Sequence, residues 1–234
     1  MLVSEVMLQQ TQVGRVLEAW PAFMDRFPTP SETASARVGD VVRAWGTLGY
    51  PRRARRLWET ANVVATSGWP EDPRVLPGVG RYTAAALAAQ VDDADVAAVD
   101  ANIRRVVQRV GGRVMGDARA EAESVRIGAP LRGRDRLLAL MDLGAIVCVA
   151  RSPGCSGCPL RPGCATRGAL PGEARRRAPA YEGSFRQRRG RVLAALRAGA
   201  RPAGDVDAEA LESLVADGLA VLHDRPDGPT AALP

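Results

Sequence analysis

All four cysteines of this 234-residue chain lie in one short segment with the spacing C-x6-C-x2-C-x5-C, at Cys148, Cys155, Cys158 and Cys164. Disulfide-bonded domains spread their cysteines along the chain, so this grouping favours metal ligation. Four thiolates suit either a zinc ion or an iron–sulfur cluster. Four-cysteine zinc sites generally contain two C-x2-C pairs, and this segment contains one. The segment is a candidate metal site whose residues alone leave the metal open.

Two carboxyl groups are candidates for acid–base chemistry. Glu5 has apolar neighbours in the segment 3–13, and an apolar environment would favour its protonated form. Asp100 follows an apolar stretch and precedes an arginine-bearing helical pattern. A protonated and an ionised carboxyl group together can break a glycosidic bond. The plainer alternatives are an exposed glutamate near a helix start and an aspartate that caps a helix.

The segment 76–80 places two glycines directly before a helical run that begins at Arg81. Gly78 and Gly80 permit backbone conformations that other residues avoid. The N–H groups of Gly78, Val79 and Gly80 could then approach a phosphate at the positive end of the following helix. Such a contact holds a nucleic-acid backbone without reading its sequence. A tight turn between two helices is the alternative.

These motifs together resemble the endonuclease III superfamily of base-excision DNA glycosylases, over about residues 1–168. Within it, the residues Ser-Glu-Val-Met-Leu-Gln-Gln-Thr-Gln-Val at 4–13 resemble the adenine glycosylase branch, the MutY family. The resemblance implies a mainly α helix-hairpin-helix glycosylase fold, with a six-helix barrel lobe and an iron–sulfur cluster lobe. It also implies a [4Fe-4S] cluster on the four cysteines and double-stranded DNA with a mismatched adenine as the partner.

The resemblance assigns catalytic roles to three residues. Glu5 would protonate N7 of adenine, Asp100 would stabilise the positively charged sugar and help to position water, and Tyr82 would support the sugar. Bifunctional relatives carry a lysine at the position of Tyr82, and its amine forms a Schiff base with the sugar. This chain contains no lysine. We therefore expect base removal without efficient strand cleavage.

Four further residues are expected at the DNA on the same resemblance. Gln10 and Thr11 would engage the base stack beside the lesion. Leu48 and Tyr50 would lie against the base opposite the adenine, with Tyr50 wedged into the stack, because flipping a nucleotide leaves a gap to fill. Core packing is the alternative for Leu48.

The composition adds a bias toward a polyanionic partner. The net charge is +6, and all 32 basic residues are arginine, with runs at 52–56, 104–109 and 175–177. A general compositional preference for arginine would also explain these runs. No stretch reaches the roughly 18 apolar residues of a membrane helix, and the N-terminus lacks a secretory signal pattern. We expect a cytoplasmic, nucleoid-associated monomer without membrane contact.

Helical patterns separated by proline and glycine predict helices over 3–26, 38–48, 51–67, 80–89, 101–110 and 134–148. The expected domains are a barrel lobe with the hairpin at 1–94, a cluster lobe at 95–168, a linker at 169–184 and a small winged-helix-like module at 185–234. In that module we expect helices over 185–197 and 207–217. Strands over 219–222 and 230–233 would pair across a turn at 227–228.

The chain departs from the family pattern at both ends. The motif around Glu5 lies near the start, so the chain is expected to be N-terminally short, and the module is too small for the C-terminal 8-oxoguanine-recognition domain of many relatives. We expect excision of adenine opposite 8-oxoguanine or guanine. One alternative is a thymine or uracil mismatch glycosylase, which the pair Gln9–Gln10 disfavours. Another is a truncated, non-catalytic DNA-binding protein, which the joint presence of Glu5, Tyr82 and Asp100 disfavours.

Overall fold

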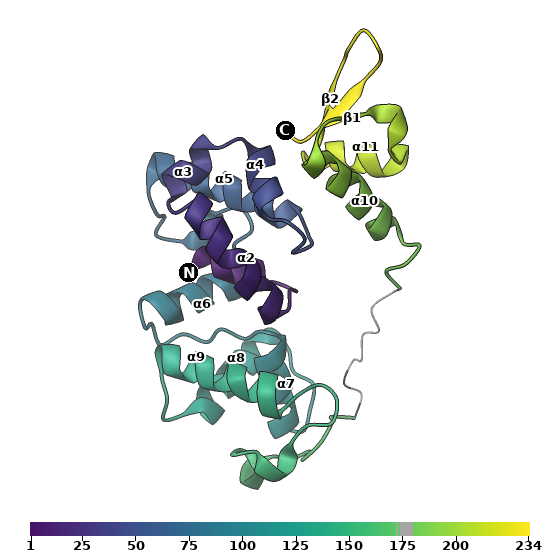
Figure 1. Cartoon of the computed structure of the whole chain (residues 1–234). Helices are drawn as coiled ribbons and strands as arrows, with labels where there is room; N and C mark the ends of the chain where they lie inside the picture. The colour runs from purple at the N-terminus through teal and green to yellow at the C-terminus, as the bar shows by residue number, and fades with distance from the viewer. Residues whose placement is uncertain (172, 174–179) are drawn as a thin grey trace. The chain divides into compact units, whose positions relative to one another are not determined.

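The computed structural model describes residues 1–171, 173 and 180–234 and is mainly helical, as predicted (Figure 1). The α-helices are α1 (Leu2–Leu8), α2 (Val13–Arg26), α3 (Pro30–Ser35), α4 (Val38–Ala44), α5 (Arg52–Ser67), α6 (Arg81–Val91), α7 (Ala101–Val110), α8 (Asp117–Gly128), α9 (Gly133–Asp142), α10 (Phe185–Ala198) and α11 (Ala208–Ala216). The strands are β1 (Arg201–Pro202), β2 (Val221–His223) and β3 (Thr230–Ala232). No helix in these ranges is long and apolar enough to cross a membrane.

The chain divides into two compact units. The first unit comprises Leu2–Gly78 and Ala178–Pro234, and the second comprises Val79–Arg177 together with Met1. This division falls after residue 78 rather than at 94, because α6 packs against α9 in the second unit. It also groups the C-terminal module with the first five helices, whose hydrophobic core it shares. The finer domain limits expected from the sequence stay a prediction.

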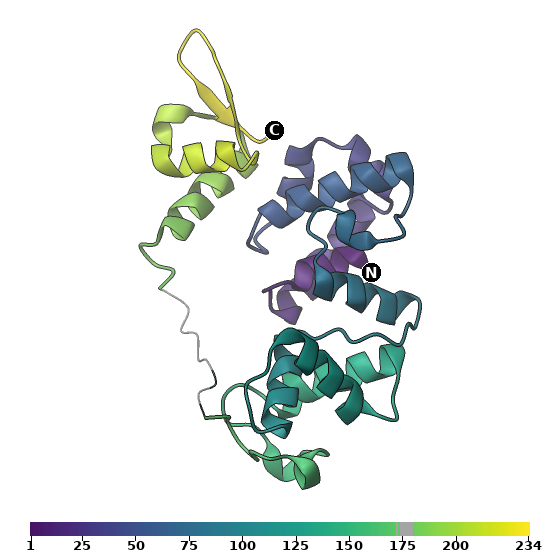
Figure 2. The same cartoon turned by 180° about the vertical axis from the view of Figure 1, so that it is seen from behind.

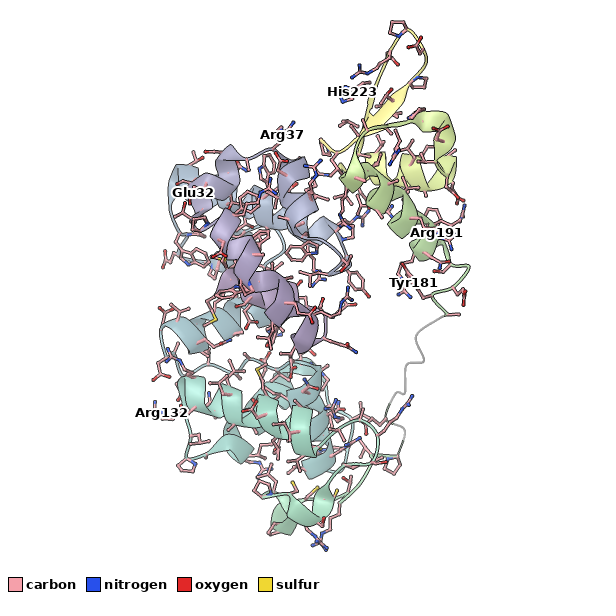
Figure 3. The ribbon with its side chains drawn as sticks, viewed as in Figure 1. Glu32, Arg37, Arg132, Tyr181, Arg191 and His223 are labelled. Atoms are coloured by element: carbon pink, nitrogen blue, oxygen red, sulfur yellow. The ribbon has the colours of Figure 1, made fainter. Side chains whose placement is uncertain are left out.

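The core of the first unit is built around aromatic side chains. Phe23, on α2, lies 5.2 Å from Phe27 and 6.2 Å from Trp45 between ring centroids, the latter in an edge-to-face arrangement. The short helix α3 begins at a complete capping box formed by Thr29 and Glu32, and Glu32 is labelled in Figure 3. A capping box thus fixes the start of α3, and aromatic packing fills the core of this unit.

The single helix expected over 3–26 is wrong, because the chain breaks between α1 and α2. Gln10 adopts a positive φ of 56°, which cannot continue a right-handed helix. The helix expected over 134–148 also ends early: α9 stops at Asp142, and one π-helical turn, Leu143–Val147, leads into Cys148. Both irregular segments contain or precede candidate site residues.

The core of the second unit lies along α7. Its apolar positions Ile103, Val106 and Val107 are almost fully buried, and α7 packs against α8 and α9. The helices of this unit, in blue-green and teal, are seen from behind in Figure 2. Exposed arginines such as Arg132, labelled in Figure 3, form surface ion pairs, here with Asp95 at 3.1 Å. The apolar positions of the amphipathic pattern at 101–110 thus face the core of this unit, as predicted from the sequence.

The C-terminal module has the predicted order of two helices followed by a hairpin. Strands β2 and β3 pair antiparallel, with Leu222 opposite Ala231, and the turn contains Gly228 at a positive φ of 109°. Strand β1 completes a three-stranded sheet in the order β1-β3-β2. The only histidine of the chain, His223, ends β2 on the surface (Figure 3). The predicted helices and hairpin are confirmed, with one strand more than expected, and the winged-helix-like character of the module stays a prediction.

Candidate active site and cysteine segment

Asp100 precedes the first turn of α7, and its two carboxylate oxygens have different donors. Oδ1 accepts a hydrogen bond from the backbone N–H of Ile103 at 2.7 Å. Oδ2 accepts one from the side-chain amide of Asn102 at 3.0 Å. The first bond is an ordinary helix N-cap, whereas the second is not required by the helix. The carboxylate is half-buried and is held in one orientation from two sides.

A chain of hydrogen bonds runs from Asp100 to the start of the cysteine segment. The Asn102 side-chain oxygen accepts from Arg105 Nη2 at 2.9 Å, so the amide nitrogen must face Asp100. Arg105 also donates through Nε to the Cys148 carbonyl at 2.6 Å and through Nη2 to the Gly144 carbonyl at 2.5 Å. Asp100 and the first cysteine are therefore joined through two side chains.

Gly144 permits the close approach of the π-helical turn to this chain. A Cβ atom at position 144 would lie 2.8 Å from Cβ of Asn102 and 2.9 Å from its carbonyl oxygen. Neither distance is tolerated between such atoms, so any side chain here would displace Asn102. The glycine fixes the spacing between the aspartate and the cysteine segment.

Two arginines of the run at 104–109, Arg105 and Arg109, bind this segment and do not form an exposed basic stripe. Arg109 is only 2% exposed and donates to the carbonyls of Val149 at 2.8 Å and Ala150 at 3.1 Å, and to Cys148 Sγ at 3.5 Å. It also pairs with Glu173 at 3.0 Å. Arg53, in the run at 52–56, is likewise buried. The run at 175–177 lies outside the described residues.

All four cysteines are unpaired and half-buried, and they line one pocket. Apolar residues complete the lining, among them Val106, Leu143 and Leu160. Within the described ranges, however, no three or more His, Cys, Asp or Glu side chains are grouped closely enough to hold a metal ion. The fold brings the thiols of Cys148, Cys155, Cys158 and Cys164 to a common pocket.

Tyr82 is the second residue of α6 and is half-buried in the same unit as Asp100. Its hydroxyl group donates to the sulfur of Met141, on α9, at 3.9 Å. The ring packs against the core cluster that contains Ile103 and Val106. The side chain is thus held at the N-terminal end of α6, directly after the hairpin.

The glycine hairpin has two different glycines. Gly78 has a φ of 81°, and a Cβ atom there would lie 3.2 Å from the Arg56 side chain. Gly80 is the N-cap of α6 with an ordinary φ of −92°, and a Cβ atom there would meet nothing within 4 Å. Val79, between them, is buried. Gly78 is needed by the fold, whereas the space beside Gly80 is open.

The other expected site residues lie in the first unit. Glu5 is 7% exposed on α1, where Val6 and Met7 are also buried, so it is not the exposed glutamate of the plainer alternative. Leu48 is 4% exposed and belongs to the core, as the packing alternative stated, whereas Tyr50 is 47% exposed. Thr11 donates through its hydroxyl to the Leu48 carbonyl at 3.3 Å. The segment with Gln10 and Thr11 is therefore adjacent to the loop with Leu48 and Tyr50.

The sequence assigned no individual role to four residues that organise these sites: Arg53, Asn102, Arg105 and Gly144. Arg53 and Arg105 were not distinguished from the other arginines, because the abundance of arginine indicated only a general basic bias. Asn102 lies two residues after Asp100, a spacing that suits a side-chain contact across a helix start. It could have been suspected on that ground.

Comparison with known proteins identifies the family of this chain. The model of the family described as "HhH-GPD superfamily base excision DNA repair protein" matches residues 3–125. The adenine DNA glycosylase of Mycobacterium tuberculosis is 46% identical, with 93% of this chain and 80% of that protein covered. That of Mycolicibacterium smegmatis is 44% identical, with 93% and 82% covered. The human adenine DNA glycosylase is 39% identical over 70% of this chain and 33% of its own length.

Solved structures share the fold. A thermostable thymine-DNA glycosylase superposes with a TM-score of 0.64 at 28% identity, covering 71% of this chain and 82% of its own. An endonuclease III in a non-covalent DNA complex superposes with a TM-score of 0.62 at 23% identity, with the same coverage. The chain belongs to the HhH-GPD superfamily of base excision DNA repair proteins. Within that superfamily it groups with the adenine DNA glycosylases, which are hydrolases of N-glycosyl bonds.

Proposed function

We propose that this adenine glycosylase excises adenine mispaired with 8-oxoguanine or guanine in double-stranded DNA, and that it leaves the DNA strand uncut. The observation that carries the proposal is the carboxylate of Asp100, fixed by Ile103 N–H and by the Asn102 amide. A fixed anion can stabilise the positive charge that develops on a deoxyribose as its base departs. The 46% identity to an adenine DNA glycosylase supports adenine as the base.

Hydrolysis requires one proton on the leaving base and one water molecule on the sugar. The C1′–N9 bond breaks with its electron pair on adenine, and a proton delivered to N7 makes the base a neutral leaving group. The water oxygen then bonds to C1′, and its proton passes to the carboxylate of Asp100. We assign the donation to N7 to Glu5, because its motif resembles that of the MutY family and its side chain is almost fully buried.

We assign to Tyr82 a supporting role beside the sugar. A phenol cannot form the Schiff base through which an amine would lead to strand cleavage. No lysine elsewhere in the chain can replace it. The product is therefore an abasic site in an intact strand.

DNA contacts are assigned to both units. The N–H groups of Gly78, Val79 and Gly80 would bind a backbone phosphate at the open start of α6. The exposed ring of Tyr50 would fill the gap left by the flipped nucleotide, and Leu48, which is buried in the core, would support this loop. Gln10 and Thr11 would meet the adjacent base stack.

We assign a [4Fe-4S] cluster to Cys148, Cys155, Cys158 and Cys164. The donor types suit such a cluster, since four free thiols line one pocket and the buried Arg109 donates to Cys148 Sγ, although in the described structure no three of them are grouped closely enough to hold a metal ion. When bound, the cluster would supply a rigid cross-link of its segment. Arg105, which binds the Cys148 carbonyl and Asn102, would then hold Asn102 and Asp100 in fixed positions relative to this segment. Iron and acid-labile sulfide in the purified protein would support this assignment, and stoichiometric zinc without sulfide would contradict it.

The proposed function is tested by single-turnover assays on duplexes with adenine opposite 8-oxoguanine, guanine or thymine, and with thymine or uracil opposite guanine. We expect free adenine from the first two, strand scission only after alkali, and no borohydride-trapped adduct. Release of thymine or uracil instead would identify a different mismatch glycosylase. Tight binding to these duplexes with no base released would identify a non-catalytic DNA-binding protein.

A further inference from the structure

Arg53 lies in the first turn of α5 and is 7% exposed, although it is an arginine in a basic run. Its guanidinium group is directed at oxygen atoms from two separate segments. Nη1 donates to the carbonyls of Val6 at 2.8 Å, Met7 at 3.0 Å and Gln9 at 2.5 Å. Nη2 donates to Thr11 Oγ1 at 3.0 Å, the Gly49 carbonyl at 3.1 Å and the Leu48 carbonyl at 3.4 Å.

These acceptors belong to the two parts of the first unit that carry its proposed site residues. Val6 and Met7 directly follow Glu5 at the end of α1. Leu48 and Gly49 directly precede Tyr50. The Arg53 guanidinium carbon also lies 5.3 Å from the centroids of both the Trp45 and the Tyr50 rings. One side chain therefore joins the helix of the acid to the loop of the aromatic wedge.

Both segments hold a strained backbone where they meet Arg53. Gln10 has a φ of 56° and Tyr50 a φ of 47°, and neither is glycine. Such conformations are unfavourable for residues other than glycine and persist only where the surroundings enforce them. Arg53 supplies donors to the carbonyls beside each of these residues, which a helical or extended backbone would otherwise satisfy.

The site is costly for a cation. Every acceptor named above is a neutral carbonyl or hydroxyl oxygen, and in the described structure Arg53 Nε has no hydrogen-bond partner. Burial lowers the pKa of Arg53 to about 10, so the group remains charged at neutral pH. Burial of a charged guanidinium group among neutral acceptors is energetically unfavourable, which indicates a role for Arg53 other than solubility or general attraction to DNA.

We propose that Arg53 is a positioning residue that couples the acid Glu5 to the wedge Tyr50. It fixes the end of α1 relative to the loop 48–50. Insertion of Tyr50 into the DNA and placement of Glu5 at the base would therefore occur together. The inference rests on the roles proposed above for Glu5 and Tyr50. It predicts that the fork geometry of arginine, and not its charge, is required, because an ammonium group cannot reach six oxygens in two directions.

The test compares Arg53→Lys with Arg136→Lys. Arg136 is a matched control, since it is 4% exposed and paired with Asp95 and the Val96 carbonyl in the other unit. For each variant we would measure duplex affinity and the single-turnover rate of adenine release. A third measurement, in an Asp100→Asn background, is the fluorescence of 2-aminopurine beside the mispaired adenine, which reports unstacking without base loss.

For Arg53→Lys we expect a rate about tenfold to a hundredfold lower, a lost fluorescence rise and an affinity within about threefold of the parent protein. Arg136→Lys should keep the rate and the fluorescence rise. Retention of both by Arg53→Lys would overturn the proposal, as would equal losses in the two variants. If the parent protein unstacks 2-aminopurine but releases no adenine, the proposed function fails, and the fluorescence comparison still decides the role of Arg53.

Thr11→Val provides a second route if Arg53→Lys does not fold. It removes the hydroxyl that accepts from Arg53 Nη2 and keeps the volume of the side chain. We expect a smaller fluorescence rise and a rate reduced about threefold to tenfold, as when one buried hydrogen bond is lost. Where Arg53→Lys does fold, the same change made in it should add little, because the two effects share one interaction. An unchanged Thr11→Val protein, or fully additive effects, would contradict the proposal.

Discussion

The two oxygens of the Asp100 carboxylate have different hydrogen-bond donors, and only one of these bonds is a helix cap. The N-cap bond to Ile103 accounts for Oδ1 and would occur in many helices. The bond from Asn102 to Oδ2 is not explained by capping, and Asn102 is itself oriented by Arg105. The two alternatives weighed for Asp100 are thus compatible, since the cap provides part of the fixed orientation that the proposed role requires.

Asn102→Ala should slow adenine release without disturbing the fold. The substitution leaves the cap intact but removes the donor to Asp100 Oδ2, so the carboxylate loses one of its two restraints. We expect a single-turnover rate about tenfold to a hundredfold lower, with little change in duplex affinity. Gln108→Ala, on the same helix, removes an amide that donates to the Met115 carbonyl and is the matched control. Equal rates for Asn102→Ala and the parent protein would show that Asp100 does not depend on this donor.

Single residues were the least predictable from the sequence. The candidate carboxylates and cysteines were identifiable because their types and spacing are distinctive. Arg53, Arg105 and Arg109 were not, because the orientation of an arginine depends on carbonyl groups that only the folded chain brings near it. The number of arginines, 32 in this chain, suggests a basic surface. Burial in the folded structure identifies those, such as Arg53 and Arg109, that hold backbone segments in place.

Among the elements, the hairpin separates a structural glycine from a proposed binding glycine. Gly78→Ala should destabilise the fold by about 1–3 kcal/mol, because alanine at a φ of 81° is strained and its Cβ would crowd Arg56. Gly80→Ala should leave the melting temperature nearly unchanged, because its conformation is ordinary and the space is open. The same methyl group should weaken duplex binding by obstructing a phosphate.

Thermal unfolding and duplex titration on the two variants separate these effects. We expect the loss of stability in Gly78→Ala and the loss of affinity in Gly80→Ala. Wild-type affinity in Gly80→Ala would exclude close approach of a phosphate at the start of α6. Surface arginines away from the hairpin, such as Arg191, labelled on α10 in Figure 3, offer neutralising substitutions that control for general charge effects.

The helices with a clear apolar face were predictable from the sequence, and the irregular joints were not. Helices α5, α7 and α10 lie close to the expected ranges, because their apolar spacing is helical and their ends carry proline, glycine or caps. The break between α1 and α2 has no glycine or proline at 9–12, and Arg53, distant in the sequence, binds the carbonyls there. Helix α8 was missed because its sequence contains few large apolar residues.

For the whole molecule, the C-terminal module is joined to α5 through Asp217. Its side chain is buried and receives hydrogen bonds from Arg52 and from Arg189, the latter at 2.5 Å. Arg55 donates to its carbonyl oxygen. Burial raises the pKa of Asp217, but the hydrogen bonds and charges of Arg52 and Arg189 outweigh burial, so the pKa lies below its usual value. Helix α5, which carries Arg53, is therefore anchored on its other side by the module.

Asp217→Asn should lower the free energy of unfolding of the first unit by about 3 kcal/mol at neutral pH, because two arginines lose their buried anion. A carboxyl group whose pKa is depressed on folding stabilises the fold fully above its unfolded pKa. That contribution is lost as the pH falls through the folded pKa. The difference between the two proteins should therefore shrink below about pH 4. Urea titrations at several pH values measure it, with the exposed Asp205→Asn as control, and a pH-independent difference would contradict the assigned ion pairs.

The central claim is that Asp100 performs the chemistry of an adenine glycosylase, and single-turnover release of adenine from a duplex with adenine opposite 8-oxoguanine tests it most directly. The parent protein and Asp100→Asn would be compared at equal occupancy of the DNA. Asparagine can still accept from Ile103 N–H, so the cap survives while the negative charge is removed. We predict release by the parent protein and a rate at least about a thousandfold lower for the variant. Comparable rates from the two proteins would contradict the account.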